Sequence, residues 1–303
     1  MPRKARSEPF SAFVRQQTQL NQNYSCTSYV FDHLKIMSTD FNYTRAIVSG
    51  VPSSLPANAQ SMTKPSEPVN LEKARQQHSA YKATLKQLGL QVIEIPPNED
   101  LPDCVFVEDA AVCVDNNALI CNLGHESRRG EAAAMKEVLK KLGFDLVEMK
   151  EPARLDGGDV LFTGKEFFVG ISKRSNKEGA ETLAKAFPSL PVSTINVKGH
   201  LHLKSTMTML APDTIVTSDD ETALAAWNEL VSKAKYQYKR VVVPESFAAN
   251  CLFINGTVVH RPEKEIPKSY PIYKGLKDPK VEMEISEFHK VDGCLTCRSI
   301  LLK

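Results

Sequence analysis

The sequence lacks any apolar run close to the roughly 20 residues that a membrane-spanning helix requires, so we expect no membrane span. It also lacks an excess of charge of one sign: 38 Lys and Arg residues stand against 36 Asp and Glu residues, and the signs are interspersed. Nucleic-acid-binding proteins carry a clustered basic patch, which this balance does not supply. No secretory apolar segment is present, so we expect the seven cysteines to be reduced thiols of a cytoplasmic protein.

What the chain does contain is one pattern used five times: a short apolar strand, an amphipathic helix and a second apolar strand. The first strands are predicted at 45–49, 118–121, 167–171, 214–217 and 257–260, and the second strands at 90–95, 144–149, 192–197, 240–243 and 281–285. Between them, apolar residues recur at helical spacing, as in Met135, Val138, Leu139 and Leu142. Units this small cannot bury separate cores, so we expect a single α/β domain over 41–303.

Residues 1–40 fit none of these repeats. They carry Arg3, Lys4, Arg6 and Arg15 with few acidic residues. This composition leaves two interpretations, a flexible or loosely docked extension and a mitochondrial transit peptide. The poorly formed apolar face of the segment favours the extension.

Local signals mark where the predicted helices begin. Asn70 precedes the first helix as a candidate N-cap, and Ser218 with Glu221 has the spacing of a capping box at the fourth. The fifth helix, near Ile272 and Leu276, is expected to be short because prolines surround it.

Polar residues follow the second strand of each unit. They lie in the segments 101–109, 155–159, 200–205, 250–253 and 293–299. If the five copies close into a ring, these segments meet at its axis. The sequence therefore predicts one central site.

Two residues in these segments suit nucleophilic catalysis. Cys297 lies between the turn residues Asp292 and Gly293 and the apolar 300–302, which places it at the mouth of a final buried strand. A thiol there becomes a nucleophile if an imidazole such as that of His202 approaches it. Neither residue is decisive alone.

A zinc site is the alternative for the same residues. His200 and His202 share one strand face, and Cys294 and Cys297 have the spacing of half a zinc knuckle. Structural zinc organises small folds that lack a core, and this chain has a core. Zinc inhibition at Cys297 and His202 stays open, because a thiolate beside an imidazole binds zinc.

Carboxylates in the same segments favour a cationic substrate. Asp103, Glu108 and Asp109 cluster in one segment, and Asp156 precedes two glycines. Carboxylates bind a planar guanidinium through paired hydrogen bonds. Arg128 and Arg174 would then hold a carboxylate of the substrate.

These segments together resemble a known family. The stretches LPDCVFVEDAAV (101–112), LDGGDVLFTGKEFFVGISKRSN (155–176), LHLKS (201–205), AANC (248–251) and KVDGCLTCRS (290–299) are similar to dimethylarginine dimethylaminohydrolases, within the guanidino-group-modifying superfamily. The similarity runs in consistent order over 42–303. It implies the pentein fold, a five-bladed α/β propeller of pseudo-symmetric ββαβ modules around a central active site.

The resemblance also implies roles for individual residues. It makes Cys297 the nucleophile, His202 the general acid and base, and Asp156 the partner of that histidine. The implied substrate-binding residues are Asp103, Glu108 and Asp109 for the guanidinium and α-amino group, Arg128 and Arg174 for the carboxylate, and Val291 for a backbone contact.

The implied reaction converts dimethylated or monomethylated arginine to citrulline and an alkylamine through a thiouronium on Cys297, relieving inhibition of nitric oxide synthesis. No metal or organic cofactor is required, and the expected partner is the small substrate, with the protein a monomer or homodimer. Two departures from the family pattern bear on this reaction. Gln60 stands at an apolar position of the lid loop, and Cys294 adds a second thiol. Arginine deiminase activity and a catalytically inert propeller remain as alternatives.

Overall fold

The computed structural model describes residues 41–303. The predicted extension at 1–40, with its mitochondrial alternative and its basic residues, lies outside the described residues. In the described part, no helix has the length and apolar character needed to cross a bilayer.

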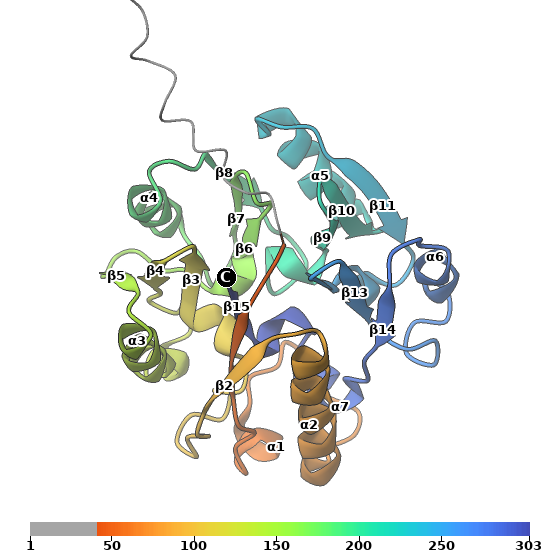
Figure 1. The fold of residues 1–303 in the computed structure, drawn as a ribbon, viewed down its shortest axis with the longest axis horizontal. Coiled ribbons are helices and arrows are strands. Elements are labelled where there is room, and N and C mark those ends of the chain that lie inside the picture. Colours follow the sequence, from red (N-terminus) through yellow and green to blue (C-terminus); the bar gives the residue numbers. More distant parts are fainter. Residues whose placement is uncertain (1–40) are drawn as a thin grey trace, which may run out of the picture. The chain divides into compact units, whose positions relative to one another are not determined.

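Residues 41–303 form five small sheets of three strands, set around a common centre with helices on the outside (Figure 1). The first four sheets in chain order are β3–β4–β5, β6–β7–β8, β9–β10–β11 and β12–β13–β14. The fifth joins the two ends of the described chain, because β15 pairs with β1 and β1 pairs with β2. The arrangement is the five-bladed α/β propeller that the sequence predicted.

The strand bounds are β1 Arg45–Ser49, β2 Gln91–Ile95, β3 Ala111–Val114, β4 Asn117–Ile120, β5 Asp145–Glu148, β6 Val160–Phe162, β7 Phe167–Ile171, β8 Val192–Asn196, β9 Met207–Ala211, β10 Thr214–Ser218, β11 Lys239–Val243, β12 Leu252–Ile254, β13 Thr257–His260, β14 Lys280–Glu282 and β15 Ile300–Leu302. In every sheet the middle strand runs antiparallel to the first strand and parallel to the third. A parallel pair needs a crossover connection. The helix of each unit supplies it.

These helices are α2 Leu71–Gln87, α3 Glu131–Lys141, α4 Lys177–Ala186, α5 Glu221–Lys233 and α6 Tyr270–Lys274, with short α1 Leu55–Asn58 and α7 Ser286–His289 elsewhere. They pack their apolar faces against the sheets: Met135 and Leu139 of α3 share one buried cluster with Ile120 of β4 and Ile300 of β15. The same cluster holds Ile47 of β1, so the core continues from one unit to the next.

The cap predictions had mixed outcomes. Asn70 is the N-cap of α2, and its side chain accepts a hydrogen bond from Lys73 N at 3.0 Å. The capping box predicted for Ser218 and Glu221 is wrong: Asp220 is the N-cap of α5 and accepts from Ala223 N at 2.9 Å. Ser218 instead belongs to β10, and its hydroxyl donates to Asp220. The fifth helix, α6, is short as expected.

A short 3₁₀ turn precedes each of the strands β3, β6, β9, β12 and β15. These turns are η1 Val107–Ala110, η3 Gly157–Asp159, η4 Leu203–Ser205, η5 Ser246–Ala249 and η6 Thr296–Arg298, and a further turn, η2 Glu126–Arg128, precedes α3. Because these five strands line the centre of the ring, the turns before them converge there. They carry the polar segments that the sequence singled out.

Candidate active site

One pocket gathers most of the predicted site residues. Its lining includes Asp103, Glu108, Asp109, Arg128, Arg174, His202, Val291 and Cys297, together with Gln60 and Cys294. Asp156 does not line the pocket and lies behind His202, to which it is hydrogen-bonded. The ring closure therefore brings together residues that lie up to 237 positions apart in the sequence, from Gln60 to Cys297.

Cys297 sits in η6, directly before β15. Cys294 N donates to its Sγ at 3.4 Å. A hydrogen bond with the Cys294 thiol, burial and the charges of Glu108 and Asp109 together raise the pKa of Cys297 well above that of a free thiol. The raised pKa favours the thiol form of Cys297 over the thiolate at neutral pH.

The close packing of the chain before this turn against Phe106 requires glycine at position 293. A Cβ on Gly293 would lie 2.5 Å from Cε1 of the Phe106 ring. Phe106 also lines the pocket, so a side chain at 293 would displace one of its walls.

His202 lies opposite, at the start of η4. Its Nε2 is 2.9 Å from Asp156 Oδ2, and Gly124 N donates to Asp156 Oδ1 at 2.8 Å. Burial favours a lower pKa for His202, but Asp109, the hydrogen bond to Asp156 and the charge of Asp159 outweigh burial and raise the pKa to about 9. The imidazole is therefore protonated at neutral pH and able to act as an acid.

Asp109 supplies a second negative charge beside His202. Burial works to raise its pKa, whereas His202 and Arg128 lower it, with the net value at about 2. Gly158 N donates to Asp109 Oδ1 at 2.8 Å. A Cβ on Gly158 would lie 2.6 Å from His202 Nδ1, so this close contact of backbone and imidazole also requires glycine.

The two arginines predicted to bind the substrate carboxylate differ in how many of their N–H groups are already hydrogen-bonded within the protein. Arg128 donates to Asp109 Oδ2 at 2.6 Å, to both oxygens of Glu131 and to Phe106 O. Four of its five N–H groups are thus engaged within the protein. Arg174 has one contact in the site, from Nη1 to Asp156 Oδ2 at 3.3 Å, and its side chain is partly exposed. Arg174 is the freer of the two to meet a ligand.

The loop before α2 covers Asp103. Gln60 N donates to both carboxylate oxygens of Asp103, at 3.1 and 3.2 Å, and Met62 N donates to Asp292. Burial raises the pKa of Asp103. Gln60 thus lines the pocket from a loop whose backbone is hydrogen-bonded to the carboxylates of Asp103 and Asp292.

Sequence reasoning missed the polar floor of the pocket. Lys204 Nζ donates to Glu108 Oε1 at 2.6 Å, and Thr296 Oγ1 donates to Glu108 Oε2 at 2.8 Å. Asn250, which had no predicted role, lines the same pocket. The only signal in the sequence was their position, since all three lie in the polar segments.

Among the described residues, neither of the two zinc sites considered from the sequence has a complete set of ligands. His200 is not in the pocket, and its Nε2 lies 3.0 Å from Thr222 Oγ1. Among residues 41–303, the group with metal-ligand spacing is Asp109, Asp156 and His202, without a cysteine. Arg128, Gly124 and Gly158 already bind its carboxylates. Zinc inhibition at Cys297 and His202 stays a prediction.

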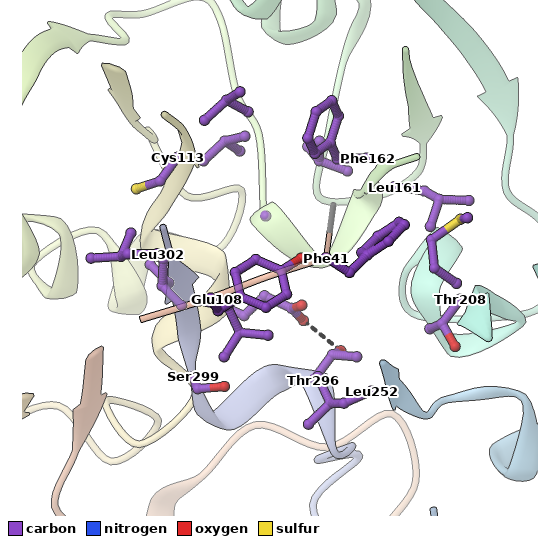
Figure 2. Close-up of a pocket in the computed structure, with 18 of the residues that line it drawn as sticks. Phe41, Glu108, Cys113, Leu161, Phe162, Thr208, Leu252, Thr296, Ser299 and Leu302 are labelled. Carbon is purple, nitrogen blue, oxygen red and sulfur yellow. Dashed lines mark hydrogen bonds between the residues drawn. The ribbon is translucent and has the colours of Figure 1, made fainter. Parts of the chain in front are cut away.

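A second pocket shares part of its lining with the first, and Figure 2 shows it in close-up. Its volume is about 190 Å³, and its lining is mainly apolar, with Leu161 of β6, Met209 of β9 and Leu252 of β12 among the residues. Glu108, Lys204 and Thr296 line both pockets. Figure 2 shows the hydrogen bond from Thr296 to Glu108 among the residues that line this second pocket.

Comparisons with known proteins agree with this geometry. Residues 53–253 match the family model described as N,N dimethylarginine dimethylhydrolase, eukaryotic. A Homo sapiens protein named putative hydrolase DDAH2 is 35% identical over 86% of this chain and 94% of its own length. An N(G),N(G)-dimethylarginine dimethylaminohydrolase of Pseudomonas aeruginosa is 33% identical over 75% of this chain and 88% of its own length.

Solved structures share the fold. A cysteine-to-serine mutant of the Pseudomonas aeruginosa enzyme, complexed with citrulline, superposes with a TM-score of 0.77 at 28% identity, covering 86% of this chain and all of that chain. The N-terminal domain of ArgZ, a cyanobacterial arginine dihydrolase, superposes with a TM-score of 0.75 at 19% identity over 86% of this chain and 98% of that chain, which shows the fold alone. The fold, the family model and the relatives agree, and the chain belongs to the dimethylarginine dimethylaminohydrolase family of hydrolases.

Proposed function

We propose that this hydrolase converts Nω,Nω-dimethyl-L-arginine, and the monomethyl form, to L-citrulline and the corresponding alkylamine. The observation that carries the proposal is one pocket in which a thiol, a protonated imidazole and three carboxylates face a common space. The names of the bacterial relatives and the citrulline in the Pseudomonas aeruginosa structure support it. In a cell that makes nitric oxide, this activity would relieve inhibition of its synthesis.

Binding of the substrate follows from the charges. Asp103, Glu108 and Asp109 accept hydrogen bonds from the guanidinium and the α-amino group. Arg174 binds the carboxylate of the substrate. Arg128 adds its one remaining N–H, and its ion pairs fix the orientation of the guanidinium. Val291 contributes a backbone contact. The substrate is held by protein groups alone, with no cofactor.

The chemistry proceeds in two steps. The Cys297 thiolate attacks the central guanidinium carbon, the carbon–nitrogen bond to the alkylamine breaks, and His202 gives its proton to the leaving nitrogen. The neutral imidazole then takes a proton from water, the hydroxide attacks the thiouronium carbon, and the carbon–sulfur bond breaks to restore Cys297. Asp156 holds the imidazole throughout. The cationic substrate lowers the pKa of Cys297 on binding, because an adjacent opposite charge favours the thiolate. The thiol proton passes to solvent at this point, since the imidazole of His202 is already protonated.

Citrulline formation tests the proposal and separates it from arginine deiminase activity. Purified protein is assayed with asymmetric dimethylarginine and with arginine, alongside Cys297→Ser. We expect turnover of the methylated substrate, at least about tenfold lower kcat/KM for arginine, and a loss of about 10³-fold or more in the variant, as nucleophile removal causes elsewhere. Equal turnover of both substrates would favour the deiminase alternative. If neither substrate yields citrulline, the catalytically inert propeller is the remaining alternative.

A further inference from the structure

The floor of the active site is a closed ring of hydrogen bonds. Glu108 accepts from Lys204 Nζ and from Thr296 Oγ1, at 2.6 and 2.8 Å. Asn250 Nδ2 completes the ring by donating to Lys204 O at 2.9 Å and to Thr296 Oγ1 at 3.0 Å. The four residues come from four different units of the propeller. The ring therefore joins turns that no strand pairing connects directly.

Asn250 uses its whole amide in this ring. Its two N–H groups bind Lys204 O and Thr296 Oγ1, and its Oδ1 accepts from Thr296 N at 3.1 Å. The side chain is 2% exposed, so water does not replace these partners. A buried, fully satisfied amide fixes the groups that it joins.

The groups that Asn250 joins flank the two reacting side chains. Thr296 is the residue before Cys297, and Lys204 lies two residues after His202. One amide thus connects the turn of the nucleophile to the turn of the acid. Movement of η6 relative to η4 would break at least one of its three bonds.

We propose that Asn250 is a positioning residue, which sets the distance between Cys297 and His202 through Thr296 and Lys204. This inference rests on the proposed function. It gives a part in the reaction to the polar segment of the fourth unit, which sequence reasoning left without one. It also explains why that segment reaches the centre although its only thiol, Cys251, is buried and has a pKa raised by burial.

Asn250→Asp tests the proposal, because Asp keeps the shape and the acceptor for Thr296 N but loses both donors. We expect kcat to fall by about 10- to 100-fold, as for small displacements of reacting groups, with KM changed by less than about threefold. Thr296→Val removes the shared hydroxyl. Its effect should not add to that of Asn250→Asp in the double variant, since both break the same connection.

Asn255→Asp is the matched control. Asn255 also makes three hydrogen bonds that join distant segments, accepting from Tyr43 N and donating to Tyr43 O and Leu88 O, and it lines neither pocket. We expect this variant to lose thermal stability as Asn250→Asp does, while its kcat stays within about twofold of wild type, as distant surface changes do. Equal kcat in the two variants would overturn the positioning role.

A readout without substrate keeps this inference separate from the proposed function. Hydrogen–deuterium exchange of the peptide 294–299 should rise several-fold in Asn250→Asp and not in Asn255→Asp, because only the first releases η6. Unchanged exchange there would also overturn the inference. If exchange rises but wild-type protein makes no citrulline from methylated arginine, the proposed function fails and the clamp by Asn250 stands.

Discussion

At the scale of single residues, the pKa values of the thiol and of the imidazole in the site are both raised. The thiol of Cys297 has a raised pKa, while His202 is held protonated by Asp109, Asp156 and Asp159. In the proposed reaction, the cationic substrate favours the thiolate of Cys297. An analogue without a positive charge should therefore leave the thiol unreactive.

The raised pKa of His202 predicts a pH-dependent stability. A histidine whose pKa is about 9 in the folded protein and 6.5 when unfolded adds stability that is complete below pH 6.5 and lost as pH rises through 9. The loss is about 3 kcal/mol, from 1.36 kcal/mol per pKa unit. Urea unfolding at pH 6, 8 and 10 should show the gap between wild type and His202→Gln closing by that amount. A constant gap would contradict the raised pKa.

At the scale of elements, the helices and the two strands that flank each of them were predictable, whereas most of the strands before these units were not. The helices α2, α3, α4 and α5 were predicted because apolar residues recur along them at helical spacing. The strands β3, β6, β9 and β12 were not predicted from the residues, because runs of three to five residues with no adjoining helical pattern give too few positions to establish a period. Only the resemblance to the family implied these four, whereas the apolar 300–302 had indicated β15.

The N-cap of α5 was assigned to the wrong residue because two residues with N-cap side chains, Ser218 and Asp220, lie close together in the sequence. Ser218 has the residue type and spacing of an N-cap, yet it lies in β10 and pairs with Val243 of β11. The strand continues through the position where the helix was expected to begin. Asp220, two residues later, is the first residue free to cap.

This assignment predicts unequal effects of two neighbouring substitutions. Asp220→Ala should lower the free energy of unfolding by about 1 to 2 kcal/mol, because Ala223 N loses its acceptor. Glu221→Ala should cost less than about 0.5 kcal/mol, as exposed changes usually do. Chemical denaturation of both variants measures the difference. A larger cost for Glu221→Ala would restore the capping box.

At the scale of the whole molecule, the ring was predicted but its internal connections were not. Five similar units with polar segments at corresponding places indicated a central site, and Cys297, His202 and the carboxylates were identified within those segments. The floor escaped prediction because its bonds join residues 96 and 188 positions apart, as Lys204 and Thr296 do with Glu108. Residue type alone does not say which polar side chains meet across such separations.

The continuous core predicts one cooperative unfolding transition. Ile300→Ala removes a buried side chain of β15 that packs with residues of β1, β4 and α3, and should cost about 2 to 4 kcal/mol. Because the units share this core, denaturant unfolding should stay a single transition with an unchanged slope. Val147→Ala, at a residue 44% exposed on β5, is the control and should cost less than about 0.5 kcal/mol. Two separate transitions would show that the units unfold independently.

The pocket takes residues from all five units, which limits how far the chain can be shortened. A variant that lacks any one unit would lose part of the pocket lining and leave the ring open. Two half-length polypeptides divided between β8 and β9 would carry Asp103 and Asp156 on one molecule and Cys297 on the other. The apolar cluster that β7 and β8 share with β9 and β10 would be divided as well. Activity would then require the two halves to associate and rebuild that cluster.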